Sequence, residues 1–228
     1  MIDKPKGRTG PIDVSVGLSP TTPVWPDDPP IDVAVRRTEL PGGELETTSR
    51  ASLSLHSGTH IDAPLHFARN GIAIDAVPFD LLIGPCTVFE HRGDGHLSAS
   101  DLDAMGFVPR RRVLFKTRNS GALRRGQLDA NYLSLLPDAL DRLVAAGVEL
   151  LGVDGFSIGP FGELNVRNHV KFCGAGRVII EVLDLSDVEP GDYHLMAMPT
   201  KFAGAEAAPA RVVLFRRDEL RCMFGDDE

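Results

Sequence analysis

Cysteine is scarce in this sequence, and its few residues form no disulfide pattern. Cys86, Cys173 and Cys222 are an odd, widely spaced set with no CxxC pair among 228 residues. Such a set is typical of reduced thiols in a cytoplasmic protein. No apolar run approaches the roughly 20 residues of a membrane-spanning helix, and the polar start of the chain has no signal-peptide core. We therefore expect a cytoplasmic protein with no membrane partner.

Positive charge is also in short supply. Lys and Arg number 24 against 32 Asp and Glu, which gives a net charge of −8. This balance argues against a general binder of nucleic acid or of anionic membranes. Hydrophobic residues make up 43% of the chain and charged residues 25%, as in ordinary soluble proteins. With no internal repeat, we expect one domain, 12–228, after a flexible N-terminal arm, 1–11, and a small molecule as its substrate.

Histidine, in contrast, is concentrated in one stretch. Three of the seven histidines and one aspartate fall within residues 56–66, all at even positions. Even positions share one face of an extended strand, and Gly58 and Pro64 both oppose a helix. This face therefore carries four candidate metal ligands, with Gly58 and Pro64 between them: His56, His60, Asp62 and His66. Unrelated histidines on a polar surface strand are the alternative, but we interpret the stretch as a metal site.

The spacing within this stretch requires a bent chain. His60 and Asp62 are about 6–7 Å apart along a strand, so their side chains can converge on one ion. His56 and His66 would be roughly 33 Å apart if the stretch were straight. Gly58 and Pro64 are the natural places for a bend. Nitrogen and carboxylate ligands without thiolates suit Zn²⁺, Mn²⁺ or Fe²⁺.

Two residues far along the chain are candidates for the remaining ligands. Glu181 follows the apolar run 178–180 and precedes Val182-Leu183, and His169 lies twelve residues before it. An unpaired carboxylate buried in such a strand costs several kcal/mol, and a metal ion would be a partner for it. Taken alone, His169 could be a surface histidine and Glu181 an edge-strand charge.

Three other features each have two interpretations. Trp25, the only tryptophan, lies in a proline-rich loop, 19–30, and is either packed on the core as a lid or an aromatic wall of a substrate pocket. The glycines in the segment 91–96 favour a turn over a second metal site for its two histidines. Arg110-Arg111-Arg112 favours a solvated strand edge over a phosphate site.

The remaining pattern alternates strands and helices and indicates an α/β protein. A helical period of apolar residues covers Leu133–Ala146, with Gly147 placed to end it. Strands are expected at Ile12–Leu18, Ile31–Thr38, Leu81–His91 (broken by Gly84-Pro85), Val113–Phe115, Val148–Val153, Tyr193–Pro199 and Arg211–Phe215.

The pattern His56-x-Gly58-Thr59-His60-x-Asp62-x-Pro64-x-His66 resembles the signature of the metal-dependent cyclase family. Its best-known members are bacterial kynurenine formamidases, and isatin hydrolase is a relative. The resemblance extends to Ser19-Pro20 and Val24-Trp25-Pro26, to the spacing of His169 and Glu181, and to Gly191-Asp192-Tyr193 and Ala208-Pro209-Ala210-Arg211.

The resemblance implies a fold and a set of roles. The fold is a single α/β domain of the swivelling β/β/α type, with a mixed sheet and flanking helices, assembled as a homodimer or homotetramer. One or two ions, Zn²⁺ or Mn²⁺, are implied. The implied ligands are His56, His60, Asp62 and Glu181 for one ion, and Asp62, His169 and Glu181 for a second. His66 is then the catalytic proton donor and acceptor, and Trp25 a substrate contact.

The implied reaction is hydrolysis of the C–N bond of an aryl formamide, N-formylkynurenine first, in tryptophan catabolism. Alternatives are hydrolysis of an isatin-like lactam, a cyclase or dehydratase step in specialised metabolism, and a non-enzymatic metal-binding protein. Two departures from the formamidase pattern bear on the substrate. Asp27-Asp28 stands where formamidases usually have Gly-Asp, and the loop 154–160 differs from their Asp-Thr-Pro-Ser type.

Overall fold

The computed structural model describes residues 10–127, 129–217 and 219. Most of the expected arm, residues 1–9, and Cys222 lie outside the described residues. The strands are β1 (Ile12–Asp13), β2 (Asp32–Glu39), β3 (Leu45–Ser52), β4 (His60–Asp62), β5 (Ile83–Glu90), β6 (Arg112–Lys116), β7 (Leu150–Val153), β8 (Val178–Glu181), β9 (Gly191–Pro199) and β10 (Ala207–Phe215). The helices are α1 (Phe79–Leu82), α2 (Ala99–Ala104), α3 (Asn119–Arg124), α4 (Pro137–Ala145) and α5 (Glu163–Gly174), with 3₁₀ turns at Pro64–His66 and Ile74–Ala76.

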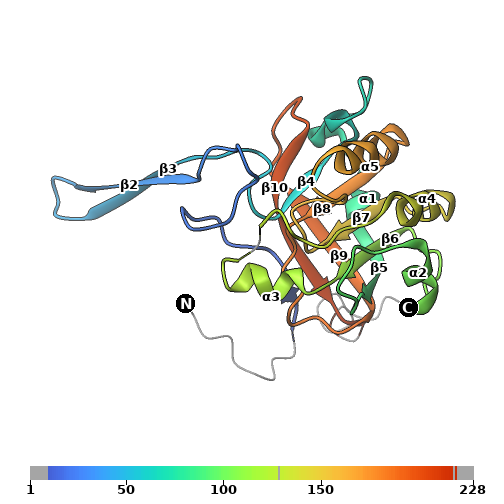
Figure 1. Cartoon of the computed structure of the whole chain (residues 1–228). Coiled ribbons are helices and arrows are strands. Elements are labelled where there is room, and N and C mark those ends of the chain that lie inside the picture. The colour runs from blue at the N-terminus through green and yellow to red at the C-terminus, as the bar shows by residue number, and fades with distance from the viewer. Residues whose placement is uncertain (1–9, 128, 218, 220–228) are drawn as a thin grey trace, which may run out of the picture.

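One mixed sheet forms the body of the molecule and closes on itself. Its strand order is β1-β10-β4-β8-β7-β6-β5-β9, and β9 pairs back onto β10. The strands β5 to β8 are parallel, whereas β4, β9 and β10 pair antiparallel with their neighbours. Helices α2, α4 and α5 lie along one side of this barrel (Figure 1). The single α/β domain with a mixed sheet and flanking helices is thus confirmed.

The parallel strands are apolar on both faces because both faces are covered. Alternate side chains enter different clusters: Leu114, Leu150 and Ile180 pack inside the barrel. Phe115, Leu151 and Ile179 pack outward against the helices. Strand β4 follows the same rule, and Ile61 points inward. The residues on either side of Ile61 therefore face the helix side of the sheet.

Several element boundaries differ from the sequence-based expectation. The helix expected from Leu133 begins only at Pro137, because proline lacks the N–H that an interior position would need but fits the first helical turn. The strand expected over Ile12–Leu18 ends at Asp13. The ladder of backbone hydrogen bonds with β10 stops there because the Val212 N–H donates to the Ser15 side-chain Oγ and not to a backbone carbonyl.

Two further expectations were wrong. The sequence predicts a break at Gly84-Pro85, but β5 runs through both residues. Ile83–Pro85 pair only with β9, and the ladder with β6 begins at Thr87, so the missing proline N–H is tolerated at an edge. Arg112 was expected at a solvated edge but is buried, and its guanidinium donates to the carbonyls of Asp80, Leu81 and Pro85.

The hairpin formed by β2 and β3 projects away from the body (Figure 1). Within the described ranges its strands pair only with each other, and nearly all of their residues are exposed. Among the described residues, no helix has the length and apolar character of a membrane span. Cys86 and Cys173 are buried free thiols, as expected.

Candidate metal centre

The stretch 56–66 is folded by its glycine and its proline. Gly58 has φ of +60°, which a residue without Cβ adopts freely. Pro64 opens the 3₁₀ turn that ends at His66. The predicted bends are therefore correct, while the predicted extended strand holds only for His60–Asp62. As a result the rings of His56 and His66 lie 4.4 Å apart between centroids.

Sheet register and one helix bring in the two distant residues. Glu181, the last residue of β8, stands directly opposite His60 of β4. Opposite residues of an antiparallel pair share a face, so both side chains leave the sheet on the side of α5. His169 lies on the buried face of α5, with its Nε2 3.3 Å from Glu181 Oε1. His169 and Glu181, which the sequence suggested as the remaining ligands, therefore lie together beside His60.

Asp62 is the centre of the cluster, and it is fully buried. Its Oδ1 lies 3.0 Å from His56 Nδ1 and 3.4 Å from His60 Nε2. Its Oδ2 lies 3.7 Å from His169 Nε2 and 3.9 Å from His66 Nε2. Each oxygen of this carboxylate therefore faces a different pair of histidines.

Glu181 repeats this division. Its Oε2 lies 3.5 Å from His60 Nε2, while its Oε1 lies 3.3 Å from His169 Nε2. One set of nearby atoms thus combines His56 and His60 with one oxygen from each carboxylate. The other set combines His169 with the second oxygen of each carboxylate. Two carboxylates between two groups of imidazoles form a site with room for one cation or for two that share the carboxylates.

Backbone carbonyls orient two of the rings. His60 Nδ1 lies 2.9 Å from the Gly58 carbonyl, and His169 Nδ1 lies 2.9 Å from the Asn165 carbonyl. A carbonyl only accepts, so each Nδ1 carries the proton and each Nε2 presents its lone pair to the cluster when the ring is neutral. His56 is reversed: its Nδ1 faces Asp62, and its Nε2 lies 3.3 Å from Glu206 Oε1.

Polar atoms without partners mark the place of a cation. Both Asp62 oxygens and His60 Nε2 are buried and have no hydrogen-bond partner among the described residues. Buried polar atoms are rarely left unsatisfied, because this costs free energy. Ligand atoms of His60, Asp62 and Glu181 lie within 4.8 Å of one another, as do those of His56, Asp62 and His66. Imidazole and carboxylate donors at this spacing fit a divalent transition-metal ion.

Electrostatics in the metal-free protein point the same way. Burial acts to lower the pKa of His60 and of His169, but the facing Asp62 and Glu181 carboxylates outweigh it and raise each pKa to about 10. Burial acts to raise the pKa of Asp62, and the surrounding imidazoles hold it well below its ordinary value. At neutral pH the His60 and His169 rings of the metal-free protein are therefore both protonated, and a bound metal ion would displace these two protons.

His66 differs from the other histidines of the cluster. Its burial lowers its pKa, and neighbouring His56 and His169 act in the same direction. The ring is therefore neutral at neutral pH and able to accept a proton. Geometry alone does not separate it from the ligands, since it lies among one of the two groups of candidate donor atoms.

Some residues of the site were not predicted from the sequence. The Ser157 hydroxyl donates to Glu181 Oε1 at 2.9 Å, and the Ile158 N–H donates to the same oxygen at 3.1 Å. The only sequence signal was the unusual loop 154–160, which contains both. Glu206 also contacts the cluster, through His56, and no pattern in the sequence singled it out. Thr59 belongs to the quoted motif, but no role was predicted for it from the sequence; its hydroxyl donates to the Val182 carbonyl.

Trp25 lies in an aromatic cluster beside this loop. Its ring meets Tyr132 and Phe156 edge-on, with 6.3 Å between centroids in each pair, and lies 5.1 Å from the ring of Phe161. It is partly exposed. The side chain thus packs on the body, as one sequence interpretation predicts, and still has a free surface.

The segment 91–96 is a turn, as the sequence favours. His91 Nε2 contacts the Gly95 carbonyl at 2.8 Å, and His96 Nδ1 lies 3.2 Å from the Ser134 hydroxyl. Neither histidine is in a group of candidate metal ligands among the described residues.

Comparison with known proteins places these features in a family. Residues 12–160, more than half of the chain, match the family model Cyclase, described as "Putative cyclase". A solved structure described as a predicted metal-dependent hydrolase from Bacillus stearothermophilus is 31% identical, with a TM-score of 0.77 over 90% of this chain and 97% of the other. A structure described as a potential metal-dependent hydrolase with cyclase activity is also 31% identical, with a TM-score of 0.76 over 91% and 98%.

A third likeness concerns the fold. Isatin hydrolase A from Ralstonia solanacearum is 23% identical, with a TM-score of 0.79 over 90% of this chain and 92% of the other. The family match covers the β4 motif, and the two more similar structures cover nearly all of both chains. The protein is therefore a member of the cyclase family.

Proposed function

We propose that this protein is a metal-dependent hydrolase that cleaves the C–N bond of an aryl formamide, with N-formylkynurenine as the first substrate to test. The observation that carries the proposal is the buried pair Asp62 and Glu181 set between histidines, where both Asp62 oxygens and His60 Nε2 have no hydrogen-bond partner among the described residues. Two relatives at 31% identity are described as a potential and a predicted metal-dependent hydrolase, which supports the same class.

The division of the carboxylate oxygens supports a two-ion assignment. We assign His56 and His60, with Asp62 and Glu181, to one Zn²⁺ or Mn²⁺. His169, with the second oxygens of the same two carboxylates, is assigned to the other. When bound, such an ion supplies a Lewis acid for a carbonyl oxygen and a water of lowered pKa.

His66 is the proposed general base and acid. It is neutral and partly exposed, and its Nε2 faces the shared carboxylate Asp62. It accepts a proton from the attacking water and returns that proton to the leaving nitrogen as the C–N bond breaks, so that formate and a free amine leave. The exposed surface of the Trp25 ring would stack on the aryl group of the substrate.

Hydrolysis of an isatin-like lactam is the second candidate. It breaks the same kind of bond, and several structures of similar fold are isatin hydrolases. The departures at Asp27 and in the loop 154–160 bear on the choice between the two substrates, because both flank the aromatic cluster of Trp25. A cyclase step remains a third candidate, since one relative is described as having cyclase activity.

The test measures turnover by metal-free protein reloaded with Zn²⁺ or Mn²⁺ separately, with a chelated control. Release of formate from N-formylkynurenine that the chelator abolishes would support the formamidase. Turnover of isatin without turnover of the formamide would replace it with the lactam hydrolase. His66→Ala should lower kcat by about 10²–10⁴-fold while bound metal is unchanged. Unchanged kcat in this variant would contradict the role of His66.

We also propose a homodimer or homotetramer in which the β2–β3 hairpin contacts a second copy of the chain. An isolated two-stranded hairpin is at best marginally stable in water. By register, Val33, Val35 and Leu45 share one face, and they are 38%, 57% and 66% exposed. Light scattering should show an oligomer that Val35→Glu weakens. A wild-type monomer would contradict the proposal.

A further inference from the structure

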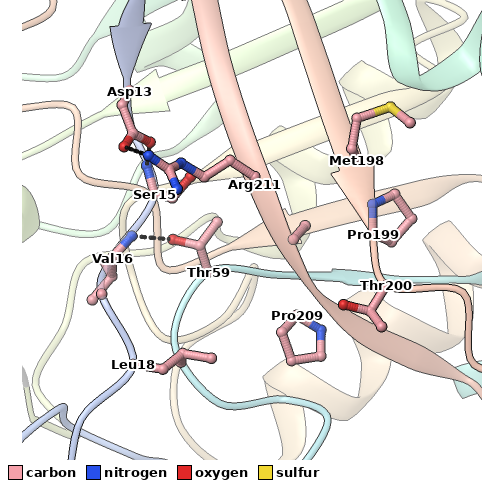
Figure 2. A pocket seen from close by; sticks show the side chains of 12 residues that line it. Asp13, Ser15, Val16, Leu18, Thr59, Met198, Pro199, Thr200, Pro209 and Arg211 are labelled. Carbon is pink, nitrogen blue, oxygen red and sulfur yellow. Dashed lines mark hydrogen bonds and ion pairs between the residues drawn. The ribbon is translucent and has the colours of Figure 1, made fainter. Parts of the chain in front are cut away.

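Thr59, one residue before His60, joins three chain segments. Its side chain is buried, and its hydroxyl donates to the Val182 carbonyl at 2.5 Å and accepts the Val16 N–H at 2.9 Å. Figure 2 shows the bond to Val16 in a pocket of about 530 Å³ between the segment 13–18 and strands β9 and β10. The backbone carbonyl of Thr59 also accepts the Ala210 N–H at 2.9 Å. This threonine is therefore fixed through both its backbone and its side chain.

The partner on the metal side is a strained residue. Val182 follows Glu181 directly and has φ of +57°. This left-handed region is unfavourable for a β-branched residue, because Cβ crowds the backbone. Such a conformation persists only where the surrounding structure holds it. Among the described residues, only Asp27 shares a positive φ without being glycine, and it lies in an exposed turn.

Both peptide groups of Val182 are held. Its N–H donates to the Gly155 carbonyl at 3.0 Å, and its carbonyl receives the Thr59 hydroxyl. The β4–β8 ladder pairs His60 with Glu181 and ends there, so the hydroxyl supplies a bond that the ladder no longer makes. The left-handed turn also sends the Val182 side chain into the cluster of Trp25 and Phe156.

We propose that Thr59 is a positioning residue of the metal centre: its hydroxyl holds Val182 in the left-handed turn and thereby keeps the Glu181 carboxylate opposite His60. This inference rests on the proposed metal role of Glu181. In this role the Thr59 hydroxyl fixes the backbone beside the site, whereas the neighbouring histidines of the motif supply ring nitrogens as metal ligands.

The first test is a zinc titration of metal-free protein against a chromophoric chelator. Thr59→Val keeps the shape of the side chain and removes the hydroxyl, and we expect about 10-fold weaker zinc binding, the scale of lost outer-sphere support. Thr59→Ser keeps the hydroxyl and should bind like wild type. Thr87→Val is the matched control, since the buried Thr87 hydroxyl donates to Asp192 at 2.6 Å on a different part of the sheet; it should leave zinc affinity unchanged.

The second test asks whether Thr59 acts through the strained turn. Glycine adopts the left-handed region freely, so in a Val182→Gly background the Thr59→Val change should cost little zinc affinity. A mutant cycle isolates this coupling. Should Thr59→Val alone fail to fold by circular dichroism, it should fold in the Val182→Gly background.

The outcomes are distinct. Wild-type protein that binds no zinc would overturn the metal assignment itself. Zinc binding by folded Thr59→Val equal to wild type would overturn only the role of Thr59. An equal loss of affinity in both backgrounds, or a double variant that fails to fold where Val182→Gly folds, would show that the hydroxyl does not act through Val182.

Discussion

The two faces of the β4–β8 strand pair are both buried, but one carries apolar side chains and the other carries titratable ones. Ile61 and Ile180 point into the barrel and are completely buried among apolar side chains. His60 and Glu181, their immediate neighbours in the chain, point to the other face and are almost as buried. The inner face is satisfied by packing alone. The outer face contains charged groups that require a partner, and the free energy of their burial is what selects a cation.

The largest effect should come from the shared carboxylate. Asp62→Asn keeps the shape of the side chain but removes the charge and one of the two carboxylate oxygens, so Glu181 alone would bridge the two sets of histidines. We expect loss of stoichiometric zinc, measured by elemental analysis after dialysis against a weak chelator. Full zinc occupancy in this variant would contradict the bridging assignment.

The inner face should respond in the opposite way. Ile61→Ala, one residue away, removes buried methyl groups and should lower the free energy of unfolding by about 2–5 kcal/mol. Zinc affinity of the folded protein should be nearly unchanged, because the side chain does not face the cluster. Urea unfolding of the metal-free protein and a zinc titration of the same variant provide the two measurements. A variant that loses zinc affinity without losing stability would remove the distinction between the faces.

A smaller effect concerns the pH dependence of the metal-free protein. His60 and His169 have folded-state pKa values raised to about 10, against about 6.5 when unfolded. Their contribution to stability is therefore complete below about pH 6.5 and is lost as the pH rises through 10. From pH 7 to 9 we expect metal-free protein to lose on the order of 2 kcal/mol for each of these two histidines. Zinc-loaded protein should lose much less, because the ion has already displaced these protons.

Thermal melting at both pH values, with and without zinc, measures this difference. Ile61→Ala is the control, since it should shift all four melting temperatures without changing their dependence on pH. An identical pH dependence with and without zinc would show that the imidazoles do not exchange protons for metal.

The outer face could be predicted from the sequence to the extent that its geometry is local. The even spacing of His60 and Asp62 and the bends at Gly58 and Pro64 are properties of neighbouring residues, and all four are correct. Glu181 could be suspected because a carboxylate beside an apolar run needs a partner. Three other features depend on tertiary contacts between distant strands and loops, which no local sequence pattern determines. They are the left-handed conformation of Val182, the hydrogen bond donated by Ser157 and the burial of Arg112.

The smallest effect contrasts the two strained residues. Val182 is buried and held by Thr59, whereas Asp27 stands in an exposed turn closed by the bond from the Asp28 N–H to the Trp25 carbonyl. Pro26 followed by a residue with φ of +78° is the pattern of a type II turn, which favours glycine at the second central position. Asp27→Gly should therefore stabilise the protein by up to about 1 kcal/mol, measured by urea unfolding with Asp28→Gly as the control.

Val182→Gly should destabilise the protein instead, because the buried side chain in the aromatic cluster is lost. Stabilisation by both changes would show that backbone strain, not packing, dominates at each position.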